Sequence, residues 1–192
     1  MRRIIVVENV TLDGVIQAPG DPDEDRRGGF EYGGWAAPYN DPVMLEEMGK
    51  DMGRTDLLFG RWTYQKMYAA WHGNPEPNPF TEVLDHAHKY VVSTTLTEPL
   101  EWVNSTLLEC DAGVSVAKLK EQPGKDLVVL GSGELVRTLI RHDLVDEYQL
   151  LIHPLVLGSG RRLFGDGSYA KLRLTNSVTT TTGVVIATYH NA

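Results

Sequence analysis

The stretch Asp126-Leu-Val-Val-Leu-Gly-Ser-Gly-Glu-Leu-Val-Arg-Thr-Leu-Ile140 joins an apolar run to a helical pattern through Gly-Ser-Gly. Leu127 to Leu130 form a continuous β-type run, and the apolar residues after Gly133 recur at the spacing of one helical face. Glycines at such a junction let a ligand approach the backbone, and the N-terminus of a helix attracts an anion. The stretch therefore predicts a strand, a turn and a helix. The turn is either a phosphate site or a tight turn without a ligand.

Length and composition are typical of one globular domain spanning residues 1–192. Of the 192 residues, 42% are hydrophobic and 23% are charged, which permits a sizeable core. The formal net charge is -8 and no dense Lys/Arg face is present, so neither a nucleic-acid nor a membrane partner is expected. Cys110 is the single cysteine, which excludes an internal disulfide and predicts a cytoplasmic protein. No metal site is expected, because His86 and His88 have no third ligand nearby.

Strand and helix patterns alternate along most of the chain. Strands are expected at 3–10, 56–60, 90–93, 106–108 and 127–130, and helices at 41–53, 63–71, 80–87 and 112–121 and from Ser132 onward. In the first helix Met44, Met48 and Met52 belong to the inward stripe, and a surface connection is expected at 72–79. This alternation predicts an α/β fold with a mostly parallel central sheet covered by helices on both faces. Strands at 147–153, 171–180 and 184–190 have no helix between them and predict an antiparallel C-terminal edge.

Residues 11–39 lack periodicity and are rich in glycine, with the acidic cluster Asp21-Pro-Asp-Glu-Asp25 near the middle. Loops of this length inside a compact domain are uncommon unless they act as lids or binding loops. We therefore expect a functional loop here.

Two further strand ends carry polar residues suited to a phosphate. Leu57-Leu-Phe-Gly-Arg-Trp-Thr-Tyr64 is again a strand that ends in glycine and opens a helix, with the charge of Arg61 and the hydroxyl of Thr63. The alternative is that Arg61 pairs with a surface acid. Val91-Val-Ser-Thr-Thr95 offers hydroxyl groups at a third strand end. Ligands of open α/β sheets bind beyond the carboxyl ends of the strands, so Gly60, Ser93 and Gly131 are expected to line one crevice.

These three segments, in this order and after Thr11-Leu-Asp-Gly-Val-Ile16, resemble the dihydrofolate reductase-like superfamily. More specifically, they resemble the C-terminal reductase domain of the bifunctional riboflavin-biosynthesis deaminase-reductase (RibD). The most specific part is Leu144-Val-Asp-Glu-Tyr148 followed by His153-Pro-Leu-Val-Leu-Gly-Ser-Gly-Arg-Arg-Leu-Phe164. The resemblance covers nearly all of the chain. It implies a three-layer αβα fold and an NADPH-dependent reductase of a small heterocyclic (pterin- or pyrimidine-like) or carbonyl-type acceptor, similar to the 5-amino-6-(5-phosphoribosylamino)uracil reductase domain.

The resemblance also implies where the parts of NADPH would bind. Cofactor phosphate falls on Gly60, Arg61 and Thr63, and the adenosine 2′-phosphate lies near Ser93 and Thr94. The pyrophosphate falls on Gly131, Ser132 and Gly133, with Glu134 and Leu135 adjacent. The turn after the first strand, namely Leu12, Asp13, Gly14, Val15 and Ile16, would cover the nicotinamide.

On the acceptor side, Pro38-Tyr-Asn-Asp-Pro42 looks like the Pro-Trp-Asn-x-Pro of folate enzymes. The place of their substrate-binding acid is Met44 here, and a thioether cannot pair with a protonated pterin, so dihydrofolate is not the expected substrate. Trp35, Tyr39 and Met44 are the expected substrate contacts, although Trp35 could equally serve packing.

Asp13 and Glu147 are the candidate catalytic acids. The alternatives are that Asp13 simply belongs to an Asp-Gly turn and that Glu147 lies on a solvated face. His153 is expected as a strand-end residue at a turn.

A reductase is the leading hypothesis, and the alternative is a nucleotide-binding or regulatory protein that retains the fold without turnover. An ordinary Rossmann NAD-binding protein is disfavoured, because Val136 and Arg137 occupy the region where the third glycine of Gly-x-Gly-x-x-Gly is expected. Residues 175–182 are Thr-rich and contain no proline to protect a sheet edge, so a homodimer through the C-terminal strands is also expected.

Overall fold

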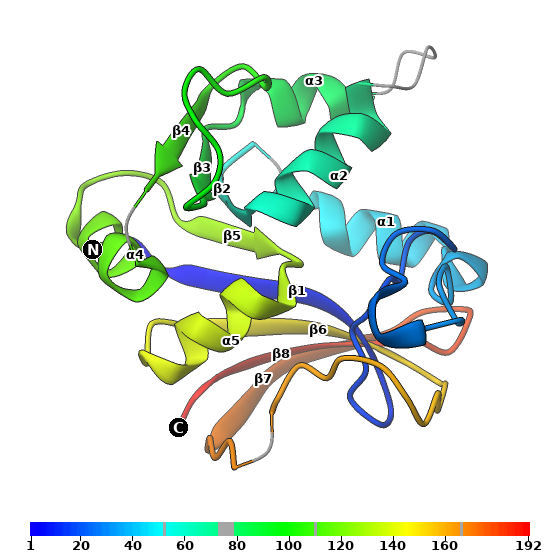
Figure 1. Cartoon of the computed structure of the whole chain (residues 1–192). Coiled ribbons are helices and arrows are strands. Elements are labelled where there is room, and N and C mark those ends of the chain that lie inside the picture. The colour runs from blue at the N-terminus through cyan, green and yellow to red at the C-terminus, as the bar shows by residue number, and fades with distance from the viewer. Residues whose placement is uncertain (52, 73–78, 110, 166) are drawn as a thin grey trace. The chain divides into compact units, whose positions relative to one another are not determined.

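The computed structural model describes residues 1–51, 53–72, 79–109, 111–165 and 167–192 (Figure 1). These residues form two compact units, each built from two segments of the chain. Unit 1 comprises Met1–Ile5 and Asp51–Val145, and unit 2 comprises Val6–Lys50 and Asp146–Ala192. A single domain spanning residues 1–192 stays a prediction. The predictions for Met52 and Cys110, and for most of the connection at 72–79, lie outside the described residues.

Unit 1 contains the parallel part of the sheet. Its elements in chain order are β2 (Asp56–Gly60), α2 (Arg61–His72), α3 (Pro79–His86), β3 (Lys89–Val92), β4 (Ser105–Leu108), α4 (Ala112–Glu121), β5 (Leu127–Leu130) and α5 (Gly133–Arg141). β2 pairs in parallel with β3 and with β5, and β3 pairs in parallel with β4. Leu57, Leu58 and Phe59 of β2 are all buried. This is what a continuous apolar run requires in a parallel sheet that is covered on both faces.

The helices of unit 1 pack on its parallel strands and on one another. α2 packs on β2 and β3, while α5 packs on β2 and against α4. Asp111 is the N-cap of α4, and its carboxylate accepts a hydrogen bond from the Val114 N–H at 3.1 Å. In α5 the buried residues Leu135, Val136 and Leu139 form the predicted inward stripe.

Unit 2 contains the antiparallel part of the sheet. Its elements are most of β1 (Ile4–Thr11), two 3₁₀ turns (Arg27–Gly29 and Ala37–Tyr39), α1 (Pro42–Gly49), β6 (Glu147–His153), β7 (Leu172–Thr179) and β8 (Val185–Asn191). β8 pairs antiparallel with both β6 and β7, and Figure 1 shows it between them. The strands of the whole sheet are hydrogen-bonded in the order β4-β3-β2-β5-β1-β6-β8-β7. The predicted α/β fold, with a mostly parallel sheet and an antiparallel C-terminal edge, is confirmed.

Most element boundaries lie within one or two residues of their predicted positions. The exception is α1, which ends at Gly49 although the methionine spacing predicted a helix as far as residue 53. Met44 is its only fully buried residue, so the inward stripe is shorter than predicted. Along the described parts of the chain, no helix combines the length and the apolar composition that crossing a membrane demands.

The long loop between β1 and α1 is packed around its own small core. Val15, Ala18, Phe30, Trp35 and Ala36 are buried together, with two partly buried leucines, Leu155 and Leu157, against them. The Gln17 side chain amide donates to the backbone oxygens of residues 25 and 27, at 3.1 and 2.9 Å. A long loop with its own core and its own hydrogen bonds is an ordered element that can shape a binding site.

Candidate functional site

Three adjacent parallel strands of unit 1 end side by side. In the pairing register Gly60 lies opposite Val92, and Leu57 lies opposite Val128, which places the last residues of β2, β3 and β5 at one edge of the sheet. The segments predicted to bind phosphate follow these last residues directly. Unit 1 therefore brings Gly60, Ser93 and Gly131 to neighbouring strand ends, as predicted.

The Ser132 hydroxyl joins two of these ends. It donates to the Thr63 hydroxyl at 2.6 Å and accepts a hydrogen bond from the Gly60 N–H at 3.0 Å. A Cβ at Gly60 would lie only 2.8 Å from this oxygen, so the contact requires glycine there. The Ser132 side chain consequently does not cap α5, and Ser132 has a left-handed backbone with a φ of 74°. The two phosphate-type turns are thus locked together, with the N-termini of α2 and α5 next to them.

Arg61 supplies a positive charge at this edge. Its side chain is exposed, and among the described residues it has no acidic partner of the kind considered as the alternative. Glu134, in the first turn of α5, is paired with Arg137 at 2.7 Å. That pair offsets the negative charge that would otherwise oppose a phosphate at this helix end.

Ser93 and Leu135 differ in detail from what the resemblance implied. Ser93 is buried, and its oxygen accepts hydrogen bonds from the N–H groups of Thr95 and Leu96 at 3.1 and 3.0 Å. It therefore shapes the turn, while the neighbouring Thr94 is exposed. Leu135 is buried in the core, so only its backbone can face a ligand. Gly133 begins α5 without a left-handed φ, so the backbone conformation does not itself require glycine there, and close approach of a ligand stays a prediction.

The strand-end residues fit the phosphates of a dinucleotide. An exposed guanidinium group, two helix N-termini and several hydroxyl groups lie at this edge, and each is a known kind of phosphate ligand. Their chemistry suits an anion even though the chain as a whole is acidic.

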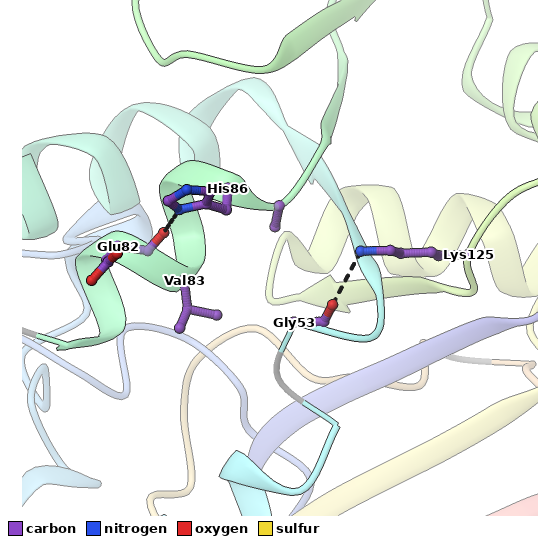
Figure 2. Close-up of a pocket in the computed structure, with 6 residues that line it drawn as sticks. Gly53, Glu82, Val83, His86 and Lys125 are labelled. Atoms are coloured by element: carbon purple, nitrogen blue, oxygen red, sulfur yellow. Dashed lines mark hydrogen bonds between the residues drawn. The ribbon is translucent and has the colours of Figure 1, made fainter.

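A separate hollow of about 350 Å³ lies elsewhere in unit 1 (Figure 2). Gly53, Ala87 and Lys125 line it, and they precede β2, β3 and β5 respectively. Across it the Lys125 ammonium donates to the Gly53 carbonyl at 3.0 Å. The hollow therefore opens at the amino ends of the strands, whereas ligands of open α/β sheets bind at the carboxyl ends. We do not include it in the candidate site.

In unit 2, Asp13 is fully engaged by its surroundings. Its carboxylate accepts hydrogen bonds from the Thr11 hydroxyl at 2.6 Å and from the N–H groups of Leu157 and Gly158 at 3.2 and 2.8 Å. The Thr11 hydrogen bond is the main cause of the lowered pKa of Asp13. Asp13 is therefore an ionised anchor that ties the turn after β1 to the loop after β6. These hydrogen bonds favour the alternative that Asp13 belongs to an Asp-Gly turn over a role as a proton donor.

The rest of the predicted nicotinamide turn divides into buried and exposed parts. Val15 and Ile16 are buried, and Val15 belongs to the loop core. Leu12 is 66% exposed. Among the apolar side chains of this turn, Leu12 is thus the one available to a ligand.

His153, which the sequence indicated only as a strand-end residue, lies at the centre of the acceptor-side residues. It is fully buried at the end of β6, and the rings of Trp35 and Tyr39 meet its ring edge-on, with centroids 5.1 and 5.3 Å away. Its Nε2 is 2.9 Å from Asn9 Oδ1, while its Nδ1 has no hydrogen-bond partner. Burial lowers the pKa of His153 to about 4, so the ring is neutral at pH 7. Nε2 then carries the proton and donates to Asn9, and Nδ1 holds a lone pair.

Met44 and Glu147 are not part of this cluster. Met44 is buried in α1, where its N–H donates to the capping carboxylate of Asp41 at 2.8 Å. Glu147 is 3.3 Å from His190 across the β6–β8 pair. It begins β6, roughly 20 Å along the strand from His153. The structure therefore separates Glu147 from the other acceptor-side residues, and its side chain, 18% exposed, lies against His190 and not on a fully solvated face.

Glu8 is a second buried polar residue that the sequence did not single out. It lies within β1, is 5% exposed, and its Oε1 has no hydrogen-bond partner. Burial, and secondarily the nearby Glu24, raise the pKa of Glu8 to about 8. The signal was a single charged residue, next to the polar Asn9, within the mostly apolar run Ile4 to Val10. It passed unnoticed because that run was interpreted only as a strand.

Comparison with known proteins gives a consistent result. The family model described as RibD C-terminal domain matches residues 2–186. The uncharacterized protein YyaP of Bacillus subtilis is 34% identical over 203 residues, which cover 98% of this chain and 95% of that protein. A second uncharacterized B. subtilis protein, YwjB, is 36% identical over 70 residues, or 36% of this chain and 40% of its own.

Three solved structures share the fold. A protein of Shewanella sp. PV-4 named for riboflavin biosynthesis superposes with a TM-score of 0.69 at 23% identity, covering 99% of both chains. A pyrimidine reductase-like protein of Corynebacterium diphtheriae gives 0.67 at 12% identity, covering 100% of this chain and 92% of its own. The dihydrofolate reductase of Enterococcus faecalis, solved with NADP(H) and RAB-propyl, gives 0.62 at 14% identity, covering 98% and 96%.

Proposed function

The chain belongs to the RibD C-terminal domain family, and we propose that it is an NADPH-dependent oxidoreductase that reduces a small heterocyclic or carbonyl-type acceptor. The observation that carries the proposal is the Ser132 junction, which fixes two phosphate-type turns together beside the exposed Arg61. Reductase-type structural relatives, one of them solved with NADP(H), support the same conclusion.

The cofactor residues belong to unit 1. Arg61 and the Thr63 hydroxyl would hold phosphate oxygens, and the N–H groups at the start of α5 would hold the pyrophosphate. Thr94, next to the buried Ser93, is placed to contact the 2′-phosphate. NADPH would supply the hydride, and the protein would orient the cofactor and exclude water.

The acceptor residues belong to unit 2. Trp35 and Tyr39 would provide aromatic walls, and the lone pair of His153 Nδ1 would accept a hydrogen bond from an N–H or O–H group of the acceptor. Leu12 would cover the nicotinamide. A buried acceptor atom without a partner usually indicates an ordered water molecule or a ligand, which is the reason for assigning this role to His153.

Two measurements test the proposal. Quenching of tryptophan fluorescence should show that NADPH binds at least about tenfold more tightly than NADH, because the extra phosphate gains charge-assisted hydrogen bonds. The absorbance of bound NADPH should then fall when pterin, flavin-precursor or quinone acceptors are added. Equal affinity for the two cofactors would contradict the cofactor assignment. Tight binding without oxidation would favour the alternative, a nucleotide-binding or regulatory protein without turnover.

We also propose that the protein is a cytoplasmic homodimer that pairs through β7. This strand is the last in the sheet order, most of its residues are exposed, and Leu174 is 52% exposed. Exposed sheet edges of this kind pair readily with another strand. Light scattering should give a dimeric mass at micromolar concentration, and Leu174→Lys should shift it toward the monomer. A monomeric mass for the unmodified protein would refute the dimer.

A further inference from the structure

Asp41 is an acid that the proposed function does not use, although it belongs to the folate-like motif Pro38-Tyr-Asn-Asp-Pro42. It is 7% exposed, and its two carboxylate oxygens have different partners. One oxygen caps α1 by accepting a hydrogen bond from the Met44 N–H at 2.8 Å. This hydrogen bond is the main cause of the lowered pKa of Asp41, so the carboxylate is ionised at neutral pH.

The second carboxylate oxygen binds the turn between β7 and β8. It accepts hydrogen bonds from the Thr181 N–H at 2.6 Å, from the Thr181 hydroxyl at 2.7 Å and from the Thr182 N–H at 3.3 Å. Together with the capping bond, these contacts use the lone pairs that a carboxylate offers. Asp41 is therefore engaged in joining the turn to the start of α1, and it does not act as a substrate-binding acid.

The same turn also holds Tyr39. The Thr182 hydroxyl donates to the Tyr39 carbonyl at 2.7 Å, and Tyr39 is the last residue of the 3₁₀ turn before α1. A Cβ added at Gly183 would lie 3.9 Å from Pro154 Cγ, so the turn also lies next to the residue that follows His153. The turn therefore contacts the backbone of Tyr39 on one side and the neighbour of His153 on the other.

The turn is closed by its own hydrogen bonds. The Thr180 N–H donates to the Val184 carbonyl at 2.9 Å, and the Val184 N–H donates to the Thr180 hydroxyl at 3.0 Å. The Gly183 N–H donates to the Thr180 carbonyl at 3.2 Å. Because these bonds do not involve Asp41, loss of the Asp41 carboxylate should detach the turn from α1 and leave the turn itself intact.

We propose that Asp41 is a positioning residue, which holds the ring of Tyr39 against His153 by fastening the β7–β8 turn to the start of α1. This inference rests on the proposed function, in which Tyr39 is a wall of the acceptor site. The rings of Tyr39 and His153 meet edge-on with their centroids 5.3 Å apart, and Tyr39 is half-buried. A wall that is fixed before the acceptor binds does not have to be ordered during binding, which favours affinity.

NMR of the protein alone tests the placement of Tyr39. The ring current of Tyr39 acts on the carbon-bound protons of the His153 ring, whose signals are identified by their loss in His153→Gln. Asp41→Ser should move these signals, because serine has one oxygen that can cap α1 but cannot also bind the turn. Asp111→Ser, at the matched N-cap of α4, should leave them in place. Unchanged His153 signals in a folded Asp41→Ser protein would overturn the proposal whether or not the protein is a reductase.

Thr182→Val tests the other end of the same link and leaves the Asp41 cap intact. It removes the hydrogen bond to the Tyr39 carbonyl and should also move the His153 signals. Thr182→Ser keeps a hydroxyl group and should restore them. If Asp41→Ser does not fold, this pair of variants decides, and identical His153 signals in the valine and serine variants then overturn the proposal.

Kinetics test the consequence for the acceptor. With an acceptor that oxidises NADPH, Asp41→Ser should raise the acceptor KM about tenfold, as for one lost contact, and leave kcat and NADPH affinity nearly unchanged. A purely structural role would instead reduce the amount of folded enzyme, which lowers the apparent kcat and leaves KM unchanged. An unchanged acceptor KM therefore overturns the proposal. If no acceptor oxidises NADPH, the reductase proposal fails by itself, and the His153 signals decide whether Asp41 positions Tyr39.

Discussion

The strand ends of unit 1 and the buried cluster of unit 2 differ in whether their polar groups have hydrogen-bond partners. In unit 1 the hydroxyl groups of Ser132 and Ser93 are satisfied by nearby turns, and the exposed Arg61 provides the charge. In unit 2 two buried atoms, Glu8 Oε1 and His153 Nδ1, have no partner. A site that binds an unchanging group such as a phosphate can have its polar groups held by hydrogen bonds before the ligand binds. A site that recognises an acceptor must retain groups that are not yet satisfied.

This comparison predicts that variants in the two regions will have different effects. Changes at the strand ends of unit 1 should alter cofactor affinity and leave the pH dependence of stability unchanged. Changes at Glu8 should do the reverse. A variant that altered both properties equally would show that the two regions do not have separate roles.

Arg61→Ala should produce the largest effect. It removes the exposed positive charge at this edge, so NADPH affinity should fall by up to about a hundredfold, equivalent to one or two charge-assisted hydrogen bonds. Most of the preference over NADH should disappear, as titration with both cofactors will show. Arg141→Ala, which removes a charge from the far end of α5, is the matched control. Comparable losses in the two variants would mean that general charge, not the Arg61 position, attracts the cofactor.

Glu8 should make the protein less stable as the pH rises. Its pKa is about 8 in the folded protein against an ordinary 4.5, so its contribution to stability is fully present below 4.5 and is lost as the pH rises through 8. Between pH 6.5 and 8 the free energy of unfolding should fall by roughly 2 kcal/mol. Glu8→Gln should flatten this slope without changing NADPH affinity. Urea unfolding at several pH values provides the measurement, and equal slopes for the two proteins would contradict a buried, protonated Glu8.

Gly133→Val tests close approach of a ligand at the start of α5. Gly133 does not have a left-handed φ, so valine causes little backbone strain and the melting temperature should change by only a few degrees. The added methyl groups should nevertheless obstruct the pyrophosphate and weaken NADPH binding about tenfold, as for one lost contact. Cofactor titration and thermal unfolding on the same variant separate the two effects. Unchanged affinity in a folded variant would remove this residue from the site.

The two regions also differ in how far the sequence could predict them. Gly60-Arg-Trp-Thr63 and Gly131-Ser-Gly133 each follow an apolar run directly, so the signal is local and the parallel sheet places both at one edge. The bond between Ser132 and Thr63 could not be predicted, because it depends on the left-handed backbone of Ser132 and on how two side chains meet.

In unit 2 the contacts join positions far apart in the sequence. His153 meets Asn9, Trp35 and Tyr39 only after β1, the loop and β6 have folded, and no spacing pattern encodes that meeting. Trp35 and Tyr39 could be predicted from their loop, whereas His153 was interpreted as a turn residue because its neighbour is proline. Asp13 shows the reverse case. Its Asp-Gly dipeptide fits both a turn and an acid, and only the three hydrogen bonds to its carboxylate decide between them.

The smallest expected effect separates the two features of Ser132. Ser132→Ala loses the hydrogen bonds to Gly60 and Thr63 but keeps a non-glycine residue at a φ of 74°, whereas Ser132→Gly loses the same bonds and relieves the backbone. A left-handed residue other than glycine costs about 1 kcal/mol, so the glycine variant should be more stable than the alanine variant by about that amount. Both should bind NADPH more weakly than the unmodified protein, because the Gly60 and Gly131 turns are no longer tied together. Thermal unfolding and cofactor titration of the two variants give both quantities. If both variants retained full affinity, the hydrogen bonds of Ser132 would have only a structural role. The strand ends of unit 1 could then no longer be described as a preformed cofactor region.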